Sequence, residues 1–176
     1  KVCLRFNPDV MDGDNAKTMT GGDLTKFGIL LEDIGTVLEI VKEYDIKVVG
    51  LHEHTGSGIQ KPESFYAAMK ALFSIATPAN FPDLEFMDFG GGFKVPYKPG
   101  EERVDYYSMG AGIARLFEEF CKRYGRELEM YFEPGKYMVA ECGTLVVEVN
   151  TLKHNRTRTI AGCNSGFPQL IRPMLY

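Results

Sequence analysis

Hydrophobic residues along this chain follow two alternating spacings. Short runs of β-branched and aromatic residues predict strands, and between them apolar residues recur at intervals of three and four, as on one face of a helix. The predicted strands are Val2–Phe6, Lys47–His52, Leu84–Phe89 and Leu128–Phe132. The predicted helices carry their apolar residues at Leu31, Ile34, Leu38 and Val41, at Phe65, Met69, Leu72 and Phe73, and at Met109, Ile113, Leu116, Phe117 and Phe120. This alternation is typical of parallel β/α units.

After Gly143 the pattern changes. The run Thr144–Thr151 is continuously rich in β-forming residues, Lys153–Arg156 reads as a turn, and Thr157–Cys163 is a second run that pairs naturally with the first. This part of the chain therefore predicts antiparallel strands that do not belong to the β/α units.

The predicted organisation is α/β, with two parts. Residues 1–143 hold four β/α units, which is half of an eightfold barrel, and residues 144–176 begin a separate β region. A complete barrel takes about 250 residues, so a chain of 176 residues cannot close one and also supply a β region. Either the sheet is open or the chain is part of something larger. A polar, glycine-containing segment, Asp9–Gly22, predicts a mobile loop.

Composition narrows the functional classes. A formal net charge of −4 argues against a nucleic-acid-binding protein, and no apolar run is long enough to span a bilayer. The four cysteines are too far apart for a Cys-x-x-Cys pair, so a zinc knuckle or redox motif is not predicted and we expect them to be buried. Low cysteine use without a visible signal peptide indicates a reducing, cytoplasmic setting.

Unusual residues follow the first long predicted strand, in the sequence Gly50–Ser57. His52 and His54 point to the same side of an extended chain. One interpretation is a zinc pair, which needs a third ligand. Another is a histidine that packs against a flat ligand, and for His52 a buried structural role is a further possibility. The Thr-Gly-Ser that follows suits contact with an anion, which favours the ligand interpretation.

Two further clusters follow the next strands. In Asp88–Phe93 three consecutive glycines let backbone amides crowd around an anion, although a tight turn explains such glycines equally well. In Glu133–Lys136 the proline keeps Glu133 extended at the end of its strand, and the alternative is a solvated surface turn. Ligands of parallel β/α folds bind where strands end. The occurrence of both clusters at strand ends therefore favours a ligand-binding site over ordinary turns.

The last cluster is Leu170–Tyr176. Arg172 and Tyr176 are candidates for binding a carboxylate, since a guanidinium can donate two parallel hydrogen bonds. An arginine that packs its stem and exposes its head is the structural alternative.

These motifs together resemble the fold-type III pyridoxal-phosphate-dependent decarboxylases, and within them the diaminopimelate decarboxylases. The shared segments are GLHEHTGS, DFGGGF, EPGK and LIRPMLY, and the early LRFNPDV and TKFGI are also similar to the family. The resemblance runs from Leu4 to Tyr176. It implies that residues 1–143 are the second half of an alanine-racemase-like (β/α)₈ barrel and that residues 144–176 start a C-terminal β domain, with pyridoxal 5′-phosphate as cofactor.

The resemblance also implies roles for individual residues. His54 would stack on the pyridine ring and Glu133 would pair with its nitrogen. The implied phosphate contacts are Ser57, the amides of Gly90, Gly91 and Gly92, and Gly135 with Lys136. Arg172, Tyr176 and Lys136 would bind the substrate. Lys136 stands where the family usually has arginine, which keeps the charge but loses the planar fork.

The implied reaction is decarboxylation of meso-2,6-diaminopimelate to L-lysine and CO₂. A carboxylate at the ring nitrogen favours this over racemisation, because it keeps the ring protonated. The alternatives are an ornithine, arginine or carboxynorspermidine decarboxylase of the same fold, a non-catalytic pyridoxal-phosphate-binding barrel, and a generic phosphate-binding β/α protein. The carboxylate-binding LIRPMLY segment favours diaminopimelate.

The family's Schiff-base lysine has no counterpart in this sequence. Lys26 lies in a different family segment, and Lys47 enters its strand at the wrong end. The family's catalytic cysteine and glutamate, contributed across a dimer, are also absent. We therefore expect a fragment that is inactive alone, derived from a homodimeric enzyme, with no catalytic residue of its own and with no metal site.

Overall fold

The computed structural model describes residues 1–13, 20–22 and 25–175. It contains two compact units, Lys1–Ala140 and Glu141–Tyr176. The predicted domain boundary at residue 143 stays a prediction.

The first unit contains a parallel sheet, which confirms the predicted α/β class. Its strands are β1 (Val2–Asn7), β2 (Ile29–Leu30), β3 (Val48–His52), β4 (Phe86–Asp88) and β5 (Glu129–Tyr131). They lie in the order β2-β1-β3-β4-β5, and each neighbouring pair is parallel. Four of these strands were predicted; the two-residue β2 is too short to produce a hydrophobic pattern.

The helices of this unit begin and end at residues that suit those positions. They are the 3₁₀ turn η2 (Leu31–Asp33), α1 (Ile34–Glu43), α2 (Pro62–Ile75), α3 (Tyr106–Tyr124) and α4 (Gly135–Val139). Pro62 occupies the first turn of α2, where its missing N–H costs nothing. The Asp105 side chain accepts hydrogen bonds from the amides of Tyr107 and Ser108, and Gly125 ends α3 at φ +94°.

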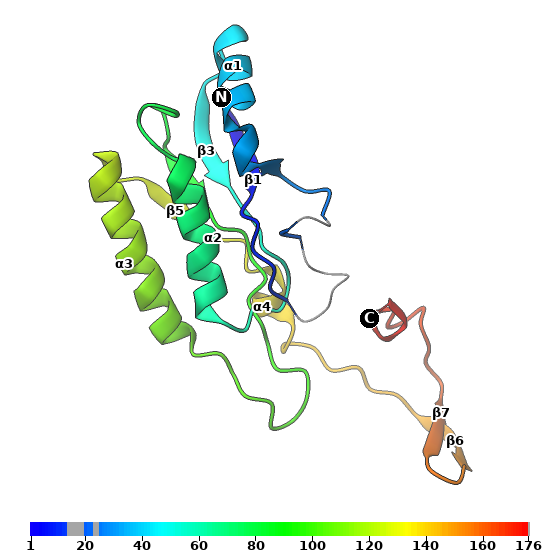
Figure 1. The fold of residues 1–176 in the computed structure, drawn as a ribbon. Helices are drawn as coiled ribbons and strands as arrows, with labels where there is room; N and C mark the ends of the chain where they lie inside the picture. Colours follow the sequence, from blue (N-terminus) through cyan, green and yellow to red (C-terminus); the bar gives the residue numbers. More distant parts are fainter. Residues whose placement is uncertain (14–19, 23–24, 176) are drawn as a thin grey trace. The chain divides into compact units, whose positions relative to one another are not determined.

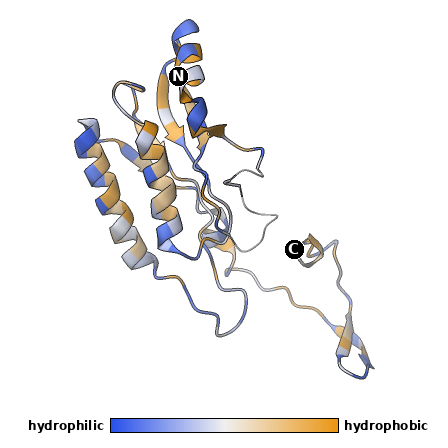
Figure 2. Ribbon diagram, viewed as in Figure 1, coloured by the Kyte–Doolittle hydropathy of each residue, from blue (hydrophilic) through white to orange (hydrophobic). Residues whose placement is uncertain are grey.

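The hydrophobic core lies between the sheet and the helices α2 and α3, which run side by side in Figure 1. Aromatic rings dominate it: Phe73 of α2 stacks on Phe120 of α3 with centroids 4.2 Å apart. Strand β3 is coloured hydrophobic over most of its length in Figure 2, and its residues Val48 to Leu51 are buried. A strand buried on both faces is typical of a parallel sheet covered by helices.

The second unit contains a hairpin of β6 (Val149–His154) and β7 (Thr159–Cys163), followed by the short helix α5 (Arg172–Leu175). The predicted antiparallel pair is confirmed. Its position was wrong in detail, because the first strand starts at Val149 rather than Thr144 and the turn follows His154 rather than including it. Apolar side chains of this unit remain exposed, among them Val146 at 85%.

Some predictions fall outside the described residues. Residues 14–19 of the predicted loop Asp9–Gly22 are not described. The predicted site residue Tyr176 is not described either. The described end of the loop packs on the chain beyond β3: the Thr20 and Gly21 amides donate to the Thr55 carbonyl, at 3.2 and 3.0 Å. Among the described residues, no helix is long and apolar enough to cross a membrane.

Candidate functional site

The carboxyl ends of three adjacent strands meet at one edge of the sheet. His52, at the end of β3, pairs with Asp88 of β4, and Asp88 pairs with Tyr131 of β5. The chain stays hydrogen-bonded beyond these strands, since Glu133 donates its amide to the Gly90 carbonyl at 2.7 Å. The three clusters singled out in the sequence are therefore brought together, as expected for a parallel sheet.

The glycines beyond β4 are required by this close packing. A Cβ atom on Gly91 would overlap the backbone carbonyl of Glu133, and one on Gly92 would overlap the carbonyl of Gly56. Gly92 also has φ +86°, a left-handed conformation that a side chain disfavours. The loops after β3, β4 and β5 thus meet at Gly90–Gly92, which are called the glycine floor below.

His54 lies on this floor as a neutral imidazole. Its Nδ1 accepts a hydrogen bond from the Gly91 amide at 3.1 Å, which places the ring proton on Nε2. Burial, together with the charges of Arg5 and His52, lowers its pKa to about 4. A held, neutral ring can pack flat against an aromatic ligand.

Beside it, His52 faces two carboxylates. Its Nε2 lies 3.8 Å from Glu133 Oε2, and ligand atoms of His52, Asp88 and Glu133 lie within 4.8 Å of one another. Burial lowers the pKa of His52, although Asp88 and Glu133 oppose this. Among the described residues, the buried Nε2 atom has no hydrogen-bond partner. This edge therefore offers unsatisfied polar groups to a ligand.

The same triad bears on the zinc interpretation. His54 does not join His52 as a second ligand, because its Nδ1 is held by Gly91. Asp88 and Glu133 instead provide the oxygen ligands that the sequence interpretation lacked. A divalent cation and a protonated ring nitrogen would compete for the same carboxylate of Glu133.

Most of the backbone amides that we expected to bind a phosphate already donate inside the protein. The Gly90 amide donates to Asp88 Oδ1 at 2.9 Å, the Gly91 amide to His54, and the Gly135 amide to the Glu133 carbonyl at 2.8 Å. Among the described residues of the set, Gly92 is the glycine whose amide donates to no protein acceptor. To bind a phosphate, the amides of Gly90, Gly91 and Gly135 would have to exchange these acceptors, and the predicted anion contacts stay a prediction.

The remaining predicted site residues are distributed between the two units. Ser57 is half-buried in the loop after β3, and half-buried Lys136 donates from Nζ to the Tyr97 hydroxyl. Arg172 begins α5 in the second unit, and Tyr176 lies outside the described residues. Their predicted part in binding a substrate carboxylate stays a prediction.

Sequence reasoning missed Glu53 and Tyr97. Glu53 alternates with His52 and His54, so it points to the opposite side of the chain, where it is fully buried. A charged residue between two histidines, directly after an apolar strand, was a visible signal. Tyr97 carried no such signal, since its contact with Lys136 joins residues 39 positions apart.

Comparison with known proteins identifies the family. The model of the pyridoxal-binding domain of pyridoxal-dependent decarboxylases matches residues 1–140. The chain belongs to this family. It is 37% identical to the diaminopimelate decarboxylase of Methanothermobacter thermautotrophicus and 34% identical to that of Escherichia coli, in each case over 100% of the chain. It spans only 42% and 41% of the lengths of these relatives.

Solved structures support the same family. The diaminopimelate decarboxylase of Helicobacter pylori complexed with L-lysine superposes with a TM-score of 0.83 at 28% identity, over 99% of the chain and 43% of that structure. A second diaminopimelate decarboxylase superposes with a TM-score of 0.82 at 32% identity, over 99% of the chain and 41% of that structure. The five parallel strands are accordingly part of a pyridoxal-dependent decarboxylase barrel.

The site fits the family's cofactor, pyridoxal phosphate. Its ring needs a flat neighbour and a carboxylate near its nitrogen, and His54 and Glu133 have these properties beyond β3 and β5, the strands on either side of β4. The Glu133 side chain is 56% exposed, so it can reach a ligand, and the orphaned His52 nitrogen lies next to it. Lys136 has the charge that a phosphate needs.

Proposed function

We propose that the protein carrying this sequence decarboxylates meso-2,6-diaminopimelate to L-lysine and CO₂, with pyridoxal phosphate as cofactor. Relatives named diaminopimelate decarboxylase match the chain over its whole length, which supports diaminopimelate as the substrate. A solved relative is described in complex with L-lysine, the product of this reaction.

The position of Glu133 carries the proposal. When bound, pyridoxal phosphate supplies an electron sink for the pair left on the substrate's α-carbon as CO₂ departs. Glu133, two residues beyond β5, would accept a hydrogen bond from the protonated ring nitrogen and keep the proton there. His54 would pack against the ring and, being neutral, would add no positive charge beside it.

The other site residues have proposed roles at the ends of the bound molecules. Ser57, Gly92 and Lys136 contact the phosphate, whereas Gly90, Gly91 and Gly135 shape the floor beneath it. The family resemblance gives Arg172 and Tyr176 a part in binding a substrate carboxylate, and it gives Lys136 such a part as well. A second carboxylate distinguishes diaminopimelate from ornithine or arginine, so these cationic and phenolic groups favour it.

The domain arrangement and the missing catalytic groups are also part of the proposal. Residues 1–143 form one half of the barrel and residues 144–176 lead into a second, β-rich domain. The lysine that attaches the cofactor and the partner subunit of a homodimer come from outside this sequence. We expect residues 1–176 alone to release no CO₂ from diaminopimelate, and detectable release would contradict this.

The test is a substrate panel on the intact protein. CO₂ release should be fastest with meso-diaminopimelate and at least about 100-fold slower with ornithine, arginine or carboxynorspermidine, because those lack the second carboxylate. A preference for one of these three other amino acids would replace the proposed substrate but keep the reaction. Failure to bind pyridoxal phosphate, measured by visible absorbance, would overturn the proposal altogether.

A further inference from the structure

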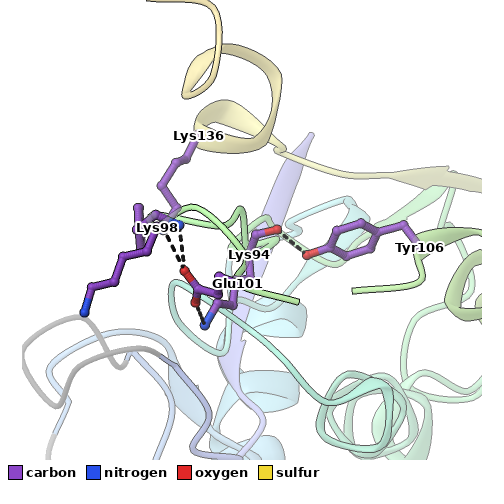
Figure 3. Close-up of polar contacts among 6 residues, drawn as sticks. Lys94, Lys98, Glu101, Tyr106 and Lys136 are labelled. Atoms are coloured by element: carbon purple, nitrogen blue, oxygen red, sulfur yellow. Dashed lines mark hydrogen bonds and ion pairs between the residues drawn. The ribbon is translucent and has the colours of Figure 1, made fainter. Parts of the chain in front are cut away.

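The segment 94–105, which joins the glycine floor to α3, is closed by one carboxylate. Glu101 Oε1 pairs with Lys94 Nζ at 2.9 Å, and the exposed fractions of these side chains are 28% and 13%. Its other oxygen accepts from the amides of Tyr97 and Lys98, at 2.7 and 3.3 Å. Figure 3 shows the Glu101 carboxylate between the Lys94 side chain and the turn that it closes.

This closure is held at any pH at which an enzyme of this kind works. The hydrogen bond from Lys94 and the Tyr97 amide lower the pKa of Glu101 to about 2, so the carboxylate stays ionised. Val95, 2% exposed, fixes the start of the segment in the core. The turn that presents Tyr97 is therefore a fixed part of the molecule.

A second contact ties the segment to α4. The Tyr106 hydroxyl donates to the Lys94 carbonyl at 2.8 Å, as Figure 3 shows. The Tyr106 ring also packs edge-on against Tyr137, with centroids 5.0 Å apart. Tyr137 follows Lys136 in α4, so the base of the segment and the backbone of Lys136 share a support.

Lys136 meets the segment at its tip. Its Nζ donates to the hydroxyl of Tyr97, a side chain that is 46% exposed. A lysine ammonium stands on a flexible four-carbon stem and lacks the rigid fork of a guanidinium. A hydroxyl partner fixes the direction of the ammonium without cancelling its charge.

We propose that the segment 94–105, closed by the Lys94–Glu101 ion pair, acts through the Tyr97 hydroxyl to position the ammonium of Lys136 for binding an anionic group. Tyr97 is thus a positioning residue, and the anion is the phosphate of the cofactor or a carboxylate of the substrate. The inference rests on the proposed function, which supplies both anions. It explains how a lysine, which lacks the planar fork of a guanidinium, can still present its charge in a fixed direction.

The experiment compares two probes on the intact apoprotein, pyridoxal 5′-phosphate and pyridoxal, which lacks the phosphate. Tyr97→Phe should raise the dissociation constant of pyridoxal phosphate by about 5- to 10-fold and leave that of pyridoxal unchanged, because one hydrogen bond to a charged group is lost. If the anion is the substrate's, Tyr97→Phe should instead raise KM for diaminopimelate by a similar factor at unchanged kcat. Either result supports positioning, and the pattern names the anion.

Two further variants separate positioning from a general structural role. Tyr107→Phe, at a side chain that is 92% exposed, should change neither constant. Adding Lys136→Arg to Tyr97→Phe should restore most of the lost affinity, since a guanidinium is preorganised. An equal rise in the dissociation constants of pyridoxal phosphate and pyridoxal in Tyr97→Phe would overturn the inference. So would a Tyr97→Phe protein in which neither dissociation constant nor KM changes. If the wild-type protein binds neither probe, the proposed function fails together with it.

Discussion

The amide of Gly91 and the Nδ1 atom of His54 form a 3.1 Å hydrogen bond that joins the loops after two neighbouring strands. The bond exists only while Nδ1 is unprotonated, because a protonated imidazole offers no acceptor. The shape of the glycine floor is thereby linked to the protonation state of one histidine.

His54 should make the protein less stable in mild acid. Its pKa is about 4 in the folded protein and 6.5 in an unfolded chain. Between these values the unfolded chain binds the extra proton, so stability is full above pH 6.5 and falls as the pH drops toward 4. His54→Asn keeps an acceptor near Nδ1 but cannot titrate. At pH 5 its unfolding free energy should exceed that of wild type by about 1 kcal/mol, a value reduced for the partial exposure of His54.

The measurement is the free energy of unfolding of both forms by urea at pH 5 and pH 7.5. The difference between them should shrink as the pH rises. A constant difference across this range would show that His54 titrates normally in the folded protein.

Gly91 should tolerate no side chain. In Gly91→Ala the new methyl would overlap the Glu133 carbonyl, which is backbone and cannot move aside. We expect a loss of about 2–4 kcal/mol in unfolding free energy and weaker cofactor binding. Gly110→Ala is the matched control: its site on α3 is open, so the change should be neutral or stabilise by up to about 1 kcal/mol. Equal effects of the two substitutions would contradict the packing argument.

The fold and the location of the site were accessible from sequence for a definite reason. Strands such as Val48–His52 are buried, so their apolar runs are unbroken, and the motifs follow directly where such strands end. Parallel pairing brings those strand ends together, so the site can be located without knowing any side-chain contact. His54 and Glu133 could be placed in this way.

The partners of individual polar groups were not accessible. That Gly91 donates to His54 and Gly135 to the Glu133 carbonyl depends on the angle at which each loop leaves its strand. Residue types alone carry no such information. The three glycines therefore predicted an anion-binding loop, whereas the structure shows that close backbone packing already requires them.

Glu133→Gln should abolish most of the activity without releasing the cofactor. A neutral amide cannot hold the ring nitrogen protonated, so we expect kcat for diaminopimelate to fall by about 100-fold or more at nearly unchanged KM. Glu129→Gln, on the same strand and exposed, is the matched control and should retain activity. Single-turnover decarboxylation by each variant provides the measurement. A Glu133→Gln protein with wild-type kcat would remove Glu133 from its proposed role.

Glu53 should be a destabilising residue at neutral and alkaline pH. It is fully buried, and among the described residues neither carboxylate oxygen has a hydrogen-bond partner. Burial raises its pKa from 4.5 to about 8, although the positive charge of Arg5 opposes the shift. Between those values the folded protein holds a proton that the unfolded chain has lost, so stability falls as the pH rises from 4.5 to 8.

Glu53→Gln, which resembles the protonated acid, should have the unfolding free energy of wild type near pH 4.5 and exceed it by about 2–4 kcal/mol at pH 8. Glu39→Gln, on the exposed face of α1, controls for the change in net charge and should show no such trend. Thermal unfolding of the three proteins across this pH range decides the matter: if the advantage of Glu53→Gln does not grow with pH, the Glu53 carboxyl ionises at its ordinary pH and has a partner in the intact protein.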